Sequence, residues 1–559
     1  MEKMKIWCEN TNSEYSVDYG TTLMDAAKAL LPEQTGNRDI LAALVDGQLK
    51  ALNFHICRPH KVQFIDYDHT NGIKTYVRSL CFVLQKAVHD LFPDKLLVIK
   101  YALPSGHYCE LHSSDNSIHI LSGAEIRQLK AAMKDIIKED LPLRKERLTE
   151  EEAEKIFSAN GQMAKVELMK SLGRYTSSVY FLDGYGDTFY GPLVPSTGYL
   201  RAFELRPFGK GVCLQYPQKG RKDEIPMMTK QVKLAAALED HDRWCRTLGT
   251  WNVGTLNQAI LDGHAKHIIN LAEARHERKY AEMADAIKRR PDAKIVFIAG
   301  PSSSGKTSSS LRLAQQCKIL GMNPKVIELD NYFVDREHTP KDEFGNYDFE
   351  SLYAMDLDFL NLQLNQLLRG EEIEIPKFNF KSGSRSFEGN RMRLEEDDIL
   401  IMEGIHALNP EMVSGVDQSK IIRIYASALT SLSIDENNNI STTDNRLLRR
   451  IVRDNRVRGI TPEETILRWD SVRRGENRNI FPFQENADIM FNSALIFELP
   501  LLKFYAEPLL RRISPTSPAY SEAVRLLKFL SYLVALSPEE IAVIPPASII
   551  REFIGGQCL

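Results

Sequence analysis

The sequence predicts a protein of the α/β class, with a parallel sheet in its second half. Between residues 291 and 495, apolar runs of strand length alternate with helical patterns, which is typical of a parallel sheet covered by helices. The first of these runs leads into a loop rich in glycine and serine and then into a helix. Ahead of this segment, the patterns predict a small β-rich unit followed by a larger α+β region.

A chain of 559 residues is long enough for roughly three or four domains, each with its own core. Its hydrophobic content of 43% and charged content of 26% are typical of a soluble globular protein. A net charge of −4 gives no overall attraction to nucleic acid, so RNA binding would need a local basic patch.

The eight cysteines form no C-x-x-C pair, which disfavours a zinc ribbon or a disulfide scaffold and suits a reducing compartment. The N-terminal residues lead into no long apolar core, so no secretory signal is expected. The longest apolar run, near 526–536, contains Lys528 and is too short to cross a bilayer. We therefore expect a cytoplasmic protein that does not contact a membrane.

The first unit shows strand patterns at 5–8 and 15–18 and an amphipathic helix over 22–31. A hairpin is predicted over 41–54, because Asp46-Gly47 is a strong turn signal between two apolar runs.

Farther along, a helix is expected near 76–92, and a long helical pattern over 256–290 ends at Pro291 and connects the two halves of the chain. The last residues are rich in helical patterns. The expected domain boundaries are 1–68, 69–240, 241–290, 291–495 and 496–559.

The most specific motif is the stretch GPSSSGKT at 300–307, which matches the pattern G-x-x-x-x-G-K-[ST]. It follows a buried-strand pattern at 295–299 and precedes a helical pattern, so an ordinary serine-rich turn is the weaker interpretation. Backbone N–H groups of such a loop bind phosphate oxygens, while Lys306 reaches the terminal phosphates and Thr307 can hold Mg²⁺. The predicted ATP-binding residues are Gly300, Ser302, Ser303, Ser304, Gly305, Lys306, Thr307 and Ser308.

Two further strand patterns, 326–330 and 399–403, each end in a carboxylate, Asp330 and Glu403. Ligands of an open α/β sheet bind beyond the carboxyl ends of its strands, so both side chains should face the phosphate loop. One carboxylate can accept the proton of an attacking hydroxyl, and the other can orient Mg²⁺. A helix cap or a surface acid is the alternative for either one alone.

Six arginines fall within thirteen positions, and spacings of three and four predict that several share one helix face. Guanidinium groups on a mobile lid stabilise the charge of a transferring phosphoryl group. A solvated helix face is the alternative for such a run. These residues are Arg446, Arg449, Arg450, Arg453, Arg456 and Arg458.

From about residue 294 to 493 the chain resembles the uridine kinase group of P-loop kinases, which is related to phosphoribulokinase. The resemblance depends on a series of motifs in order, and any one of them except the first would be weak evidence. In sequence they are GPSSSGKT at 300–307, LDNYF at 329–333, NYD at 346–348, IPKFNF at 375–380, MEGI at 402–405, RRIVRD at 449–454 and ADI at 487–489.

The resemblance implies a P-loop kinase domain that uses ATP and Mg²⁺ to phosphorylate the 5′-hydroxyl of a nucleoside. It implies that Asp330 is the general base, with Lys306 as a further catalytic residue, and that Glu403 and Thr307 serve Mg²⁺. The other implied contacts are with the ribose from Asp348, with the base from Phe378 and Phe380, and with phosphates or the closing lid from Arg450, Arg453 and Arg458.

Four positions depart from the family pattern. Phe378 and Gly383 stand where the family reads the base with a tyrosine and a histidine, while Phe333 and Arg468 replace a tyrosine and a glutamine. Losing polar groups that read a base edge removes the discrimination they supply. The acceptor therefore stays open between a pyrimidine nucleoside and another sugar-bearing molecule, such as a purine nucleoside or a pentose phosphate. His406 is either an acceptor contact or a buried structural residue.

The front half, residues 1–240, resembles the N-terminal half of threonyl-tRNA synthetase, with a β-grasp TGS domain followed by an α+β editing-type domain. The similar stretches are 1–68, 141–168 and 191–198. The editing-type domain carries two pairs of His/Cys residues, and those positions hold Arg78, Phe82, Phe189 and Leu193 here. None of these can act as the metal ligand or base, so we expect aminoacyl hydrolysis to be lost.

The front half also motivates a second hypothesis, a regulatory RNA- or ligand-binding protein in which nucleotide hydrolysis is a switch. Asp330 argues against it, because a switch needs no base for an acceptor hydroxyl. The acidic net charge gives RNA binding no support. The helical segments 256–290 and 496–559 can pack on the kinase or on a second subunit, so a homo-oligomer also stays open.

Overall fold

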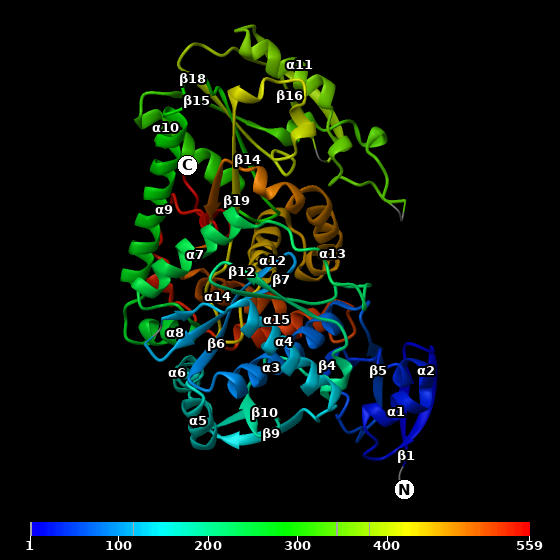
Figure 1. The fold of residues 1–559 in the computed structure, drawn as a ribbon. Coiled ribbons are helices and arrows are strands. Elements are labelled where there is room, and N and C mark those ends of the chain that lie inside the picture. Colours follow the sequence, from blue (N-terminus) through cyan, green and yellow to red (C-terminus); the bar gives the residue numbers. More distant parts are fainter. Residues whose placement is uncertain (1–2, 116, 343–344, 380) are drawn as a thin grey trace.

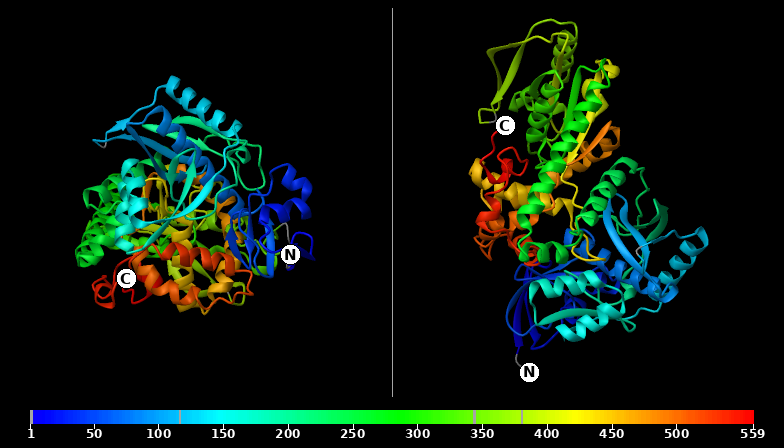
Figure 2. Two further views of the ribbon diagram at one scale, coloured as in Figure 1. Left: turned by 90° about the horizontal axis from the view of Figure 1, so that it is seen from below. Right: turned by 90° about the vertical axis from the view of Figure 1, so that its left-hand side faces the viewer.

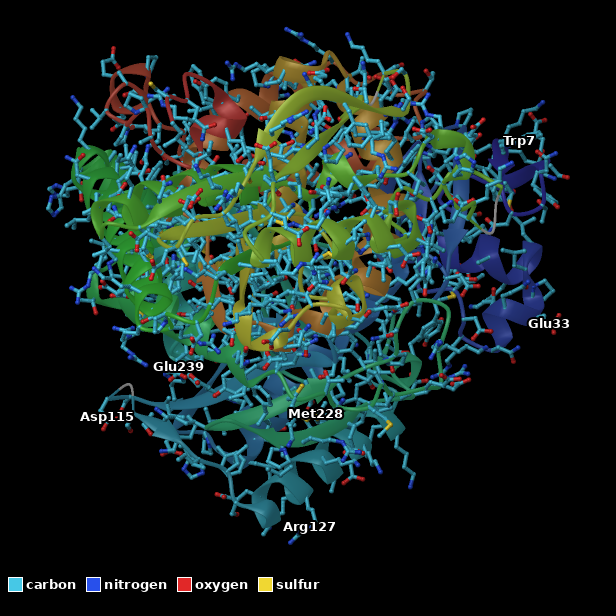
Figure 3. All side chains as sticks on the ribbon, turned by 90° about the horizontal axis from the view of Figure 1, so that it is seen from above. Trp7, Glu33, Asp115, Arg127, Met228 and Glu239 are labelled. Atoms are coloured by element: carbon cyan, nitrogen blue, oxygen red, sulfur yellow. The ribbon has the colours of Figure 1, made fainter. Side chains whose placement is uncertain are left out.

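The computed structural model describes residues 3–115, 117–342, 345–379 and 381–559. The N-terminal unit and the hairpin formed by β16 (Ile373–Asn379) and β17 (Ser384–Met392) lie at opposite ends of the molecule (Figure 1). Trp7, which is 41% exposed, and Glu33 mark the N-terminal unit at one edge, and Arg127 of the front half lies at another (Figure 3). Among the described residues, no helix has both the length and the apolar character needed to cross a bilayer.

The N-terminal unit is a five-stranded sheet in the order β2-β1-β5-β3-β4, with β1 and β5 parallel and the other pairs antiparallel. Asp46 and Gly47 both have positive φ, 50° and 75°, as a tight hairpin turn requires, so the predicted hairpin is confirmed. The elements are β1 (Lys3–Cys8), β2 (Ser13–Asp18), α1 (Leu23–Leu30), α2 (Pro32–Gly36), β3 (Ala42–Val45), β4 (Gln48–Lys50) and β5 (His60–Ile65).

The rest of the front half contains two antiparallel sheets around the buried helix α3. One has the order β12-β13-β7-β6, with β8 paired to β7, and the other has the order β11-β10-β9. The elements are α3 (Thr70–Leu91), β6 (Lys95–Leu103), β7 (Gly106–Ser113), β8 (Ile118–His119), α4 (Gly123–Lys138), β9 (Arg144–Thr149), α5 (Glu150–Ala159), α6 (Met163–Leu172), β10 (Thr176–Leu182), β11 (Tyr185–Asp187), β12 (Glu204–Phe208) and β13 (Gly211–Gln215).

Three helices connect the front half to the second half: α7 (Val232–Thr247), α8 (Val253–Leu261) and α9 (Ala265–Lys288). The single helical pattern expected over 256–290 is wrong in one respect, because α8 ends before Gly263, whose φ is 80°. That left-handed conformation ends helices and favours glycine. The helix α7 runs through residue 240, where the sequence suggested a boundary.

The second half contains a five-stranded sheet in the order β15-β18-β14-β19-β20, and every pairing in it is parallel. The predicted α/β class with a parallel sheet is therefore confirmed. The elements are β14 (Ile295–Ala299), α10 (Lys306–Ile319), β15 (Asn323–Glu328), α11 (Leu357–Leu368), β16 (Ile373–Asn379), β17 (Ser384–Met392), β18 (Asp398–Glu403), β19 (Ile421–Ser427), α12 (Thr442–Arg453), α13 (Pro462–Asn479) and β20 (Ile489–Asn492).

Helices cover both faces of this sheet. Alternate residues of β14 enter two cores, Val296 and Ile298 one of them, and Ile295 and Phe297 the other. The first core also contains the helices after the sheet, which therefore pack on the same chain. They are α14 (Glu498–Leu510), α15 (Tyr520–Leu530), α16 (Pro538–Ile541) and α17 (Arg551–Ile554). The red C-terminal end lies beside α10, and both views in Figure 2 keep it with the second half of the chain.

The two halves meet through buried charged and polar groups. Lys165 Nζ, from α6, lies 2.9 Å from an Asp187 carboxylate oxygen and 3.6 Å from one of Asp435, which belongs to the loop after β19. The hydroxyl of Tyr190 donates to Asp435 at 2.7 Å. Because a buried charge without its partner is costly, these contacts hold the halves in one arrangement.

Candidate active site

The site forms where three adjacent strands of the parallel sheet end. Strand β14 leads into the phosphate loop, and its neighbour β18 ends at Glu403, whose Cα pairs with that of Ile298. Asp330 follows β15 in a short 3-10 turn, Leu329–Tyr332. The carboxyl edge of the sheet therefore brings Asp330, Glu403 and the loop to one crevice.

The phosphate loop has a conformation that requires glycine at two positions. Gly305 has φ of 83° and Ser303 has φ of 59°, and a Cβ at Gly300 would overlap the carbonyl oxygen of Ala426. The hydroxyls of Ser303 and Ser304 are buried and have no hydrogen-bond partner within the described part of the chain. The loop thus offers unused donors beside the N-terminus of α10, as a phosphate site requires.

Two arginines of α12 hold the loop from behind. Arg446 Nε donates to the carbonyl of Ser302 at 2.9 Å, and Arg449 lies 3.4 Å from the carbonyl of Ser303. Both are fully buried, Arg446 against Glu476 and Arg449 against Glu498. These two arginines share one side of α12, as the spacing predicted, but that side packs into the core, so the expected place on a mobile lid is wrong for them.

Three other arginines share one buried carboxylate beside the loop. Asp454 accepts from Arg450 at 3.1 Å and Arg453 at 2.9 Å, and Arg458 lies 3.5 Å from it. Arg450 also donates to the Ser302 hydroxyl at 2.8 Å. They sit on α12 and on the π-helical turn Asp454–Arg458, a distortion that is frequent at functional sites.

A hydroxyl and a carboxylate meet at the predicted metal position. Thr307 Oγ1 donates to Glu403 Oε1 at 2.6 Å. Burial raises the pKa of Glu403 to about 7; Lys306 opposes that shift, and Asp330 adds to it. No set of three His, Cys, Asp or Glu residues forms a closed metal cage in the described ranges. This open pair of oxygens fits Mg²⁺, which takes few protein ligands and completes its shell with phosphates and water.

Asp330 is half-buried at the mouth of this crevice. Burial raises the pKa of Asp330 above its ordinary value, and Glu328 raises it further, while Lys306 and Arg458 lower it. A carboxylate whose pKa is raised is a better proton acceptor than one in open water.

The acceptor side of the crevice is more apolar. Phe378, on β16, is buried, and its ring centre lies 5.6 Å from that of Phe333. Asp348 accepts from the backbone N–H of Glu350 at 3.2 Å, and Arg478 lies 3.4 Å from its carboxylate. Phe380, also predicted here, lies outside the described residues.

The Arg336 side chain packs against Gly383, the position where the family has its histidine. Gly383 has φ of 72°, and a Cβ there would lie 2.7 Å from Arg336 Nε. The backbone of Gly383 also accepts from the Arg336 N–H at 2.8 Å. His406 is 1% exposed, and burial lowers its pKa to about 4, so its ring is neutral.

Two glutamates of the site were not predicted from the sequence. Burial raises the pKa of Glu350 to about 7, and the charges of Glu476, Arg450, Lys306 and Asp330 also act on it. The charges that act on Glu350 are those of the crevice, and its backbone N–H donates to Asp348. Its only sequence signal is its position two residues after the Asn-Tyr-Asp motif.

The second of these residues, Glu552, comes from the C-terminal segment. Its carboxylate accepts from the Ser308 hydroxyl at 2.5 Å and lies 3.4 Å from the Ser308 backbone nitrogen. Gln557 donates to the same hydroxyl at 2.7 Å, and Ile549 packs against Gly305. The end of the chain therefore covers the first turn of α10, and no local motif indicates this.

The positions that match the synthetase pairs are filled by packing contacts. Arg78 donates to the carbonyl of Pro192 at 3.2 and 3.0 Å, and the rings of Phe82 and Phe189 meet edge to face at 5.1 Å. Leu193 is 1% exposed. These four side chains stabilise the fold and bring no proton acceptor or metal ligand together.

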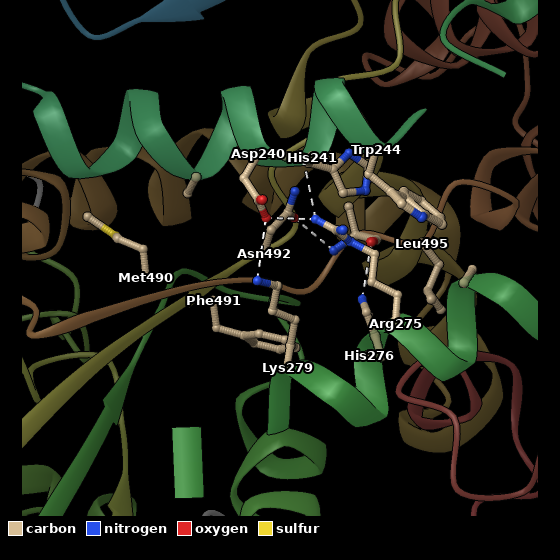
Figure 4. Close-up of a pocket in the computed structure, with 13 residues that line it drawn as sticks. Asp240, His241, Trp244, Arg275, His276, Lys279, Met490, Phe491, Asn492 and Leu495 are labelled. Carbon is tan, nitrogen blue, oxygen red and sulfur yellow. Dashed lines mark hydrogen bonds and ion pairs between the residues drawn. The ribbon is translucent and has the colours of Figure 1, made fainter. Parts of the chain in front are cut away.

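A small cavity between α7, α9 and β20 is a packing junction rather than a second site (Figure 4). Arg275 and Lys279 of α9 converge on Asp240, at 2.7 and 3.6 Å. Its volume of about 60 Å³ is far below that of a nucleotide site, which spans roughly 300–1,000 Å³.

The two halves of the chain are similar to different known proteins. The family model "Phosphoribulokinase / Uridine kinase family" matches residues 295–496. The uridine kinase of Bacillus pumilus is 32% identical over 197 residues, 35% of this chain and 84% of that protein. That of Macrococcus caseolyticus is 30% identical, also over 197 residues and 86% of its length.

The N-terminal region is similar to another class of enzyme. The threonine–tRNA ligase of Carboxydothermus hydrogenoformans is 31% identical over 185 residues, 33% of this chain but only 28% of the ligase. A second ligase, from Desulforamulus reducens, is 31% identical over 193 residues and 29% of its length. The chain thus spans less than a third of these two ligases.

Proposed function

The chain belongs to the phosphoribulokinase / uridine kinase family, and from this premise we propose that it transfers the γ-phosphate of ATP to the 5′-hydroxyl of a nucleoside. The observation that carries the proposal is the meeting of Asp330, Lys306 and the Thr307–Glu403 pair at one edge of the sheet. A base for a hydroxyl beside a phosphate loop is the arrangement that an acceptor kinase needs.

In the proposed reaction Asp330 accepts the proton of the acceptor hydroxyl as its oxygen attacks the γ-phosphorus. Lys306 and the backbone N–H groups of the loop hold the phosphates in line. Thr307 and Glu403 would hold Mg²⁺, which supplies positive charge to the phosphate oxygens when it is bound. Positioning and charge neutralisation carry most of such a reaction.

Arg450, Arg453 and Arg458 would neutralise the transferring group. In the structure they surround Asp454, which holds three guanidinium groups within reach of the loop. Each guanidinium has five N–H donors, so these arginines can donate to phosphate oxygens while Asp454, which is buried, keeps its charge paired. Asp454 is thus a positioning residue in this proposal.

The acceptor pocket supports a nucleoside in general more than a pyrimidine in particular. Asp348 would bind the ribose hydroxyls, and Phe378 would pack against the base. The Arg336 guanidinium beside Gly383 favours a second candidate. This is an acceptor that carries a phosphate or a carbonyl edge at the end farthest from the reacting hydroxyl. A pentose phosphate or a purine nucleoside fits that description.

The test is release of ADP from ATP and Mg²⁺ against a panel of uridine, cytidine, adenosine, guanosine and ribose 5-phosphate. Stimulation by uridine or cytidine, abolished in Asp330→Asn, supports the proposal for a pyrimidine nucleoside. Stimulation by adenosine, guanosine or ribose 5-phosphate, without stimulation by uridine or cytidine, supports the second candidate. Turnover that no acceptor stimulates and that survives in Asp330→Asn would indicate a regulatory NTPase instead.

A further inference from the structure

A second cleft lies between the front half and the C-terminal segment around α15, away from the phosphate loop. Its volume is about 580 Å³, and it is bounded by the end of the β3–β4 hairpin, the β9–β10 face and the segment around α15. Gly191 and Pro192 form part of its wall. A volume of this size suits a drug-sized or nucleotide-sized molecule.

The cleft is lined by cations, most of which pair with no carboxylate of the described residues. Five of its cations form no ion pair with any carboxylate in the portion of the chain described, and its lining there includes no Asp or Glu. A sixth cation in the wall, Lys165, is by contrast neutralised by Asp187. The five are Lys50, Lys145, Arg147, Arg174 and Lys528.

These cations repel one another. Burial, together with the charges of Lys145, Arg78, Arg174 and Lys50, lowers the pKa of Lys528 to about 8. Holding like charges together costs free energy in the absence of an anion, and a bound anion would relieve it. Cations on an ordinary solvated surface spread apart because they repel one another, whereas here cations from four separate segments line one cleft.

Aromatic rings line the same cleft. Lys145 Nζ lies 5.5 Å from the centre of the Tyr180 ring, and the Arg174 guanidinium lies 4.6 Å from that of Tyr532. Tyr190 and Tyr532 meet edge to face at 4.3 Å. A ligand seated among these groups would contact both flat apolar surfaces and cations.

We propose that this cleft binds a free nucleoside polyphosphate, with its phosphates on Lys145, Arg174 and Lys528 and its base against the tyrosine rings. The number of unpaired cations favours a polyphosphate over a single phosphate, and the rings favour a nucleotide over inorganic polyphosphate. This site is separate from the kinase site, because no residue of the phosphate loop lines it.

The test must exclude nucleotide bound at the phosphate loop. Full-length Lys306→Ala loses the lysine that reaches the terminal phosphates, and it is the background for calorimetric titration with UTP, ATP, UMP and pyrophosphate. We expect UTP or ATP to bind this variant, and to bind more weakly as salt rises. Adding Lys145→Ala and Arg174→Ala should weaken that binding at least about tenfold.

The matched control adds Lys134→Ala instead, since Lys134 is an exposed lysine of α4 outside the cleft. It should leave the affinity unchanged. In the wild-type chain, UTP should also slow hydrogen exchange in β9 and α15, which reports on the cleft even if a variant folds poorly. Equal affinity with and without Lys145 and Arg174, or no nucleotide binding to Lys306→Ala, would overturn the proposal. So would tight binding of a single-stranded RNA oligonucleotide where free nucleotides do not bind.

Discussion

The phosphate loop of the second half and the cleft beside Gly191-Pro192 differ in how their polar groups are held. Around the loop, the polar groups are held in definite contacts, since Thr307 donates to Glu403 and Arg446 and Arg449 hold the backbone. Asp330 follows the adjacent strand β15, and we propose that it accepts the proton of the acceptor. Chemistry of this kind depends on a few atoms held within fractions of an ångström.

Around the front cleft the reactive positions are filled by Arg78, Phe82 and Phe189, which pack on one another and on Pro192. The hollow itself persists, with its cations unpaired. In our two proposals the loop carries a reaction and the front cleft binds a ligand, and binding tolerates looser geometry than catalysis does. Substitutions in the kinase site and in the front half test this difference, and they follow from the largest expected effect to the smallest.

Asp330→Asn should remove the proton acceptor and leave the fold intact. We expect acceptor-dependent ADP release to fall about 1,000-fold, within the range typical of general bases. Binding of ATP, measured by calorimetry, should change little. The control is Asp292→Asn, an exposed carboxylate ahead of β14. A variant that retained more than a tenth of the activity would contradict the role of Asp330 and with it the contrast between the two sites.

Phe82→Ala should damage the front half without changing the chemistry of the second half. The buried ring packs on Phe189, so its removal should lower the free energy of unfolding by about 3–5 kcal/mol. The measurement is unfolding in denaturant, with ADP release assayed where the variant remains folded. Tyr175→Ala, at a side chain that is 90% exposed, is the control and should cost little. An unchanged stability would mean that this packing is dispensable.

Glu403→Gln should have opposite effects on the stability of the fold and on the Mg²⁺-dependent activity. Because burial raises the pKa of Glu403 to about 7, the folded protein binds a proton between about pH 4.5 and 7 that the unfolded chain does not. The metal-free wild type should therefore gain stability as the pH falls through 7. Glutamine mimics the protonated form, so the variant should be about 1–3 kcal/mol more stable at pH 8 and should lose that part of the pH dependence.

The same variant should release ADP about 100-fold more slowly at saturating Mg²⁺, because the charge that orients the ion is gone. Glu396→Gln, at an exposed glutamate in the turn before β18, is the control. A Glu403→Gln protein that kept its Mg²⁺ response would remove Glu403 from the metal site.

Much of the site could be predicted because its determinants are local. A phosphate loop is made by its own backbone, and the ends of parallel strands meet at one edge whatever the helices do, so the sequence around Asp330 and Glu403 indicated both. The α/β class followed from alternation along the chain for the same reason.

The rest depends on tertiary packing that spacing does not encode. The periodicity of α12 indicated a shared arginine face, but it could not say that Arg446 and Arg449 turn into the core. Glu552 reaches Ser308 across 244 residues of chain. The cations of the front cleft are likewise far apart in sequence, and the overall charge of the protein has the opposite sign.

Glu552→Gln should have the smallest effect, a change in the KM for ATP, and it tests how the C-terminal segment over the phosphate loop affects nucleotide binding. The carboxylate takes the Ser308 donors in the first turn of α10, where the helix N-terminus attracts the phosphates of a nucleotide. A negative group at that place competes with phosphate for the donors and repels its charge. Glutamine keeps the size and a hydrogen bond but not the charge, so the KM for ATP should fall about threefold to tenfold. Glu539→Gln, exposed on α16, is the control and should leave the KM unchanged. A higher KM in Glu552→Gln would show the opposite arrangement, in which the C-terminal segment supports nucleotide binding, and the covered loop would then be the closed form of the site rather than one that nucleotide must open.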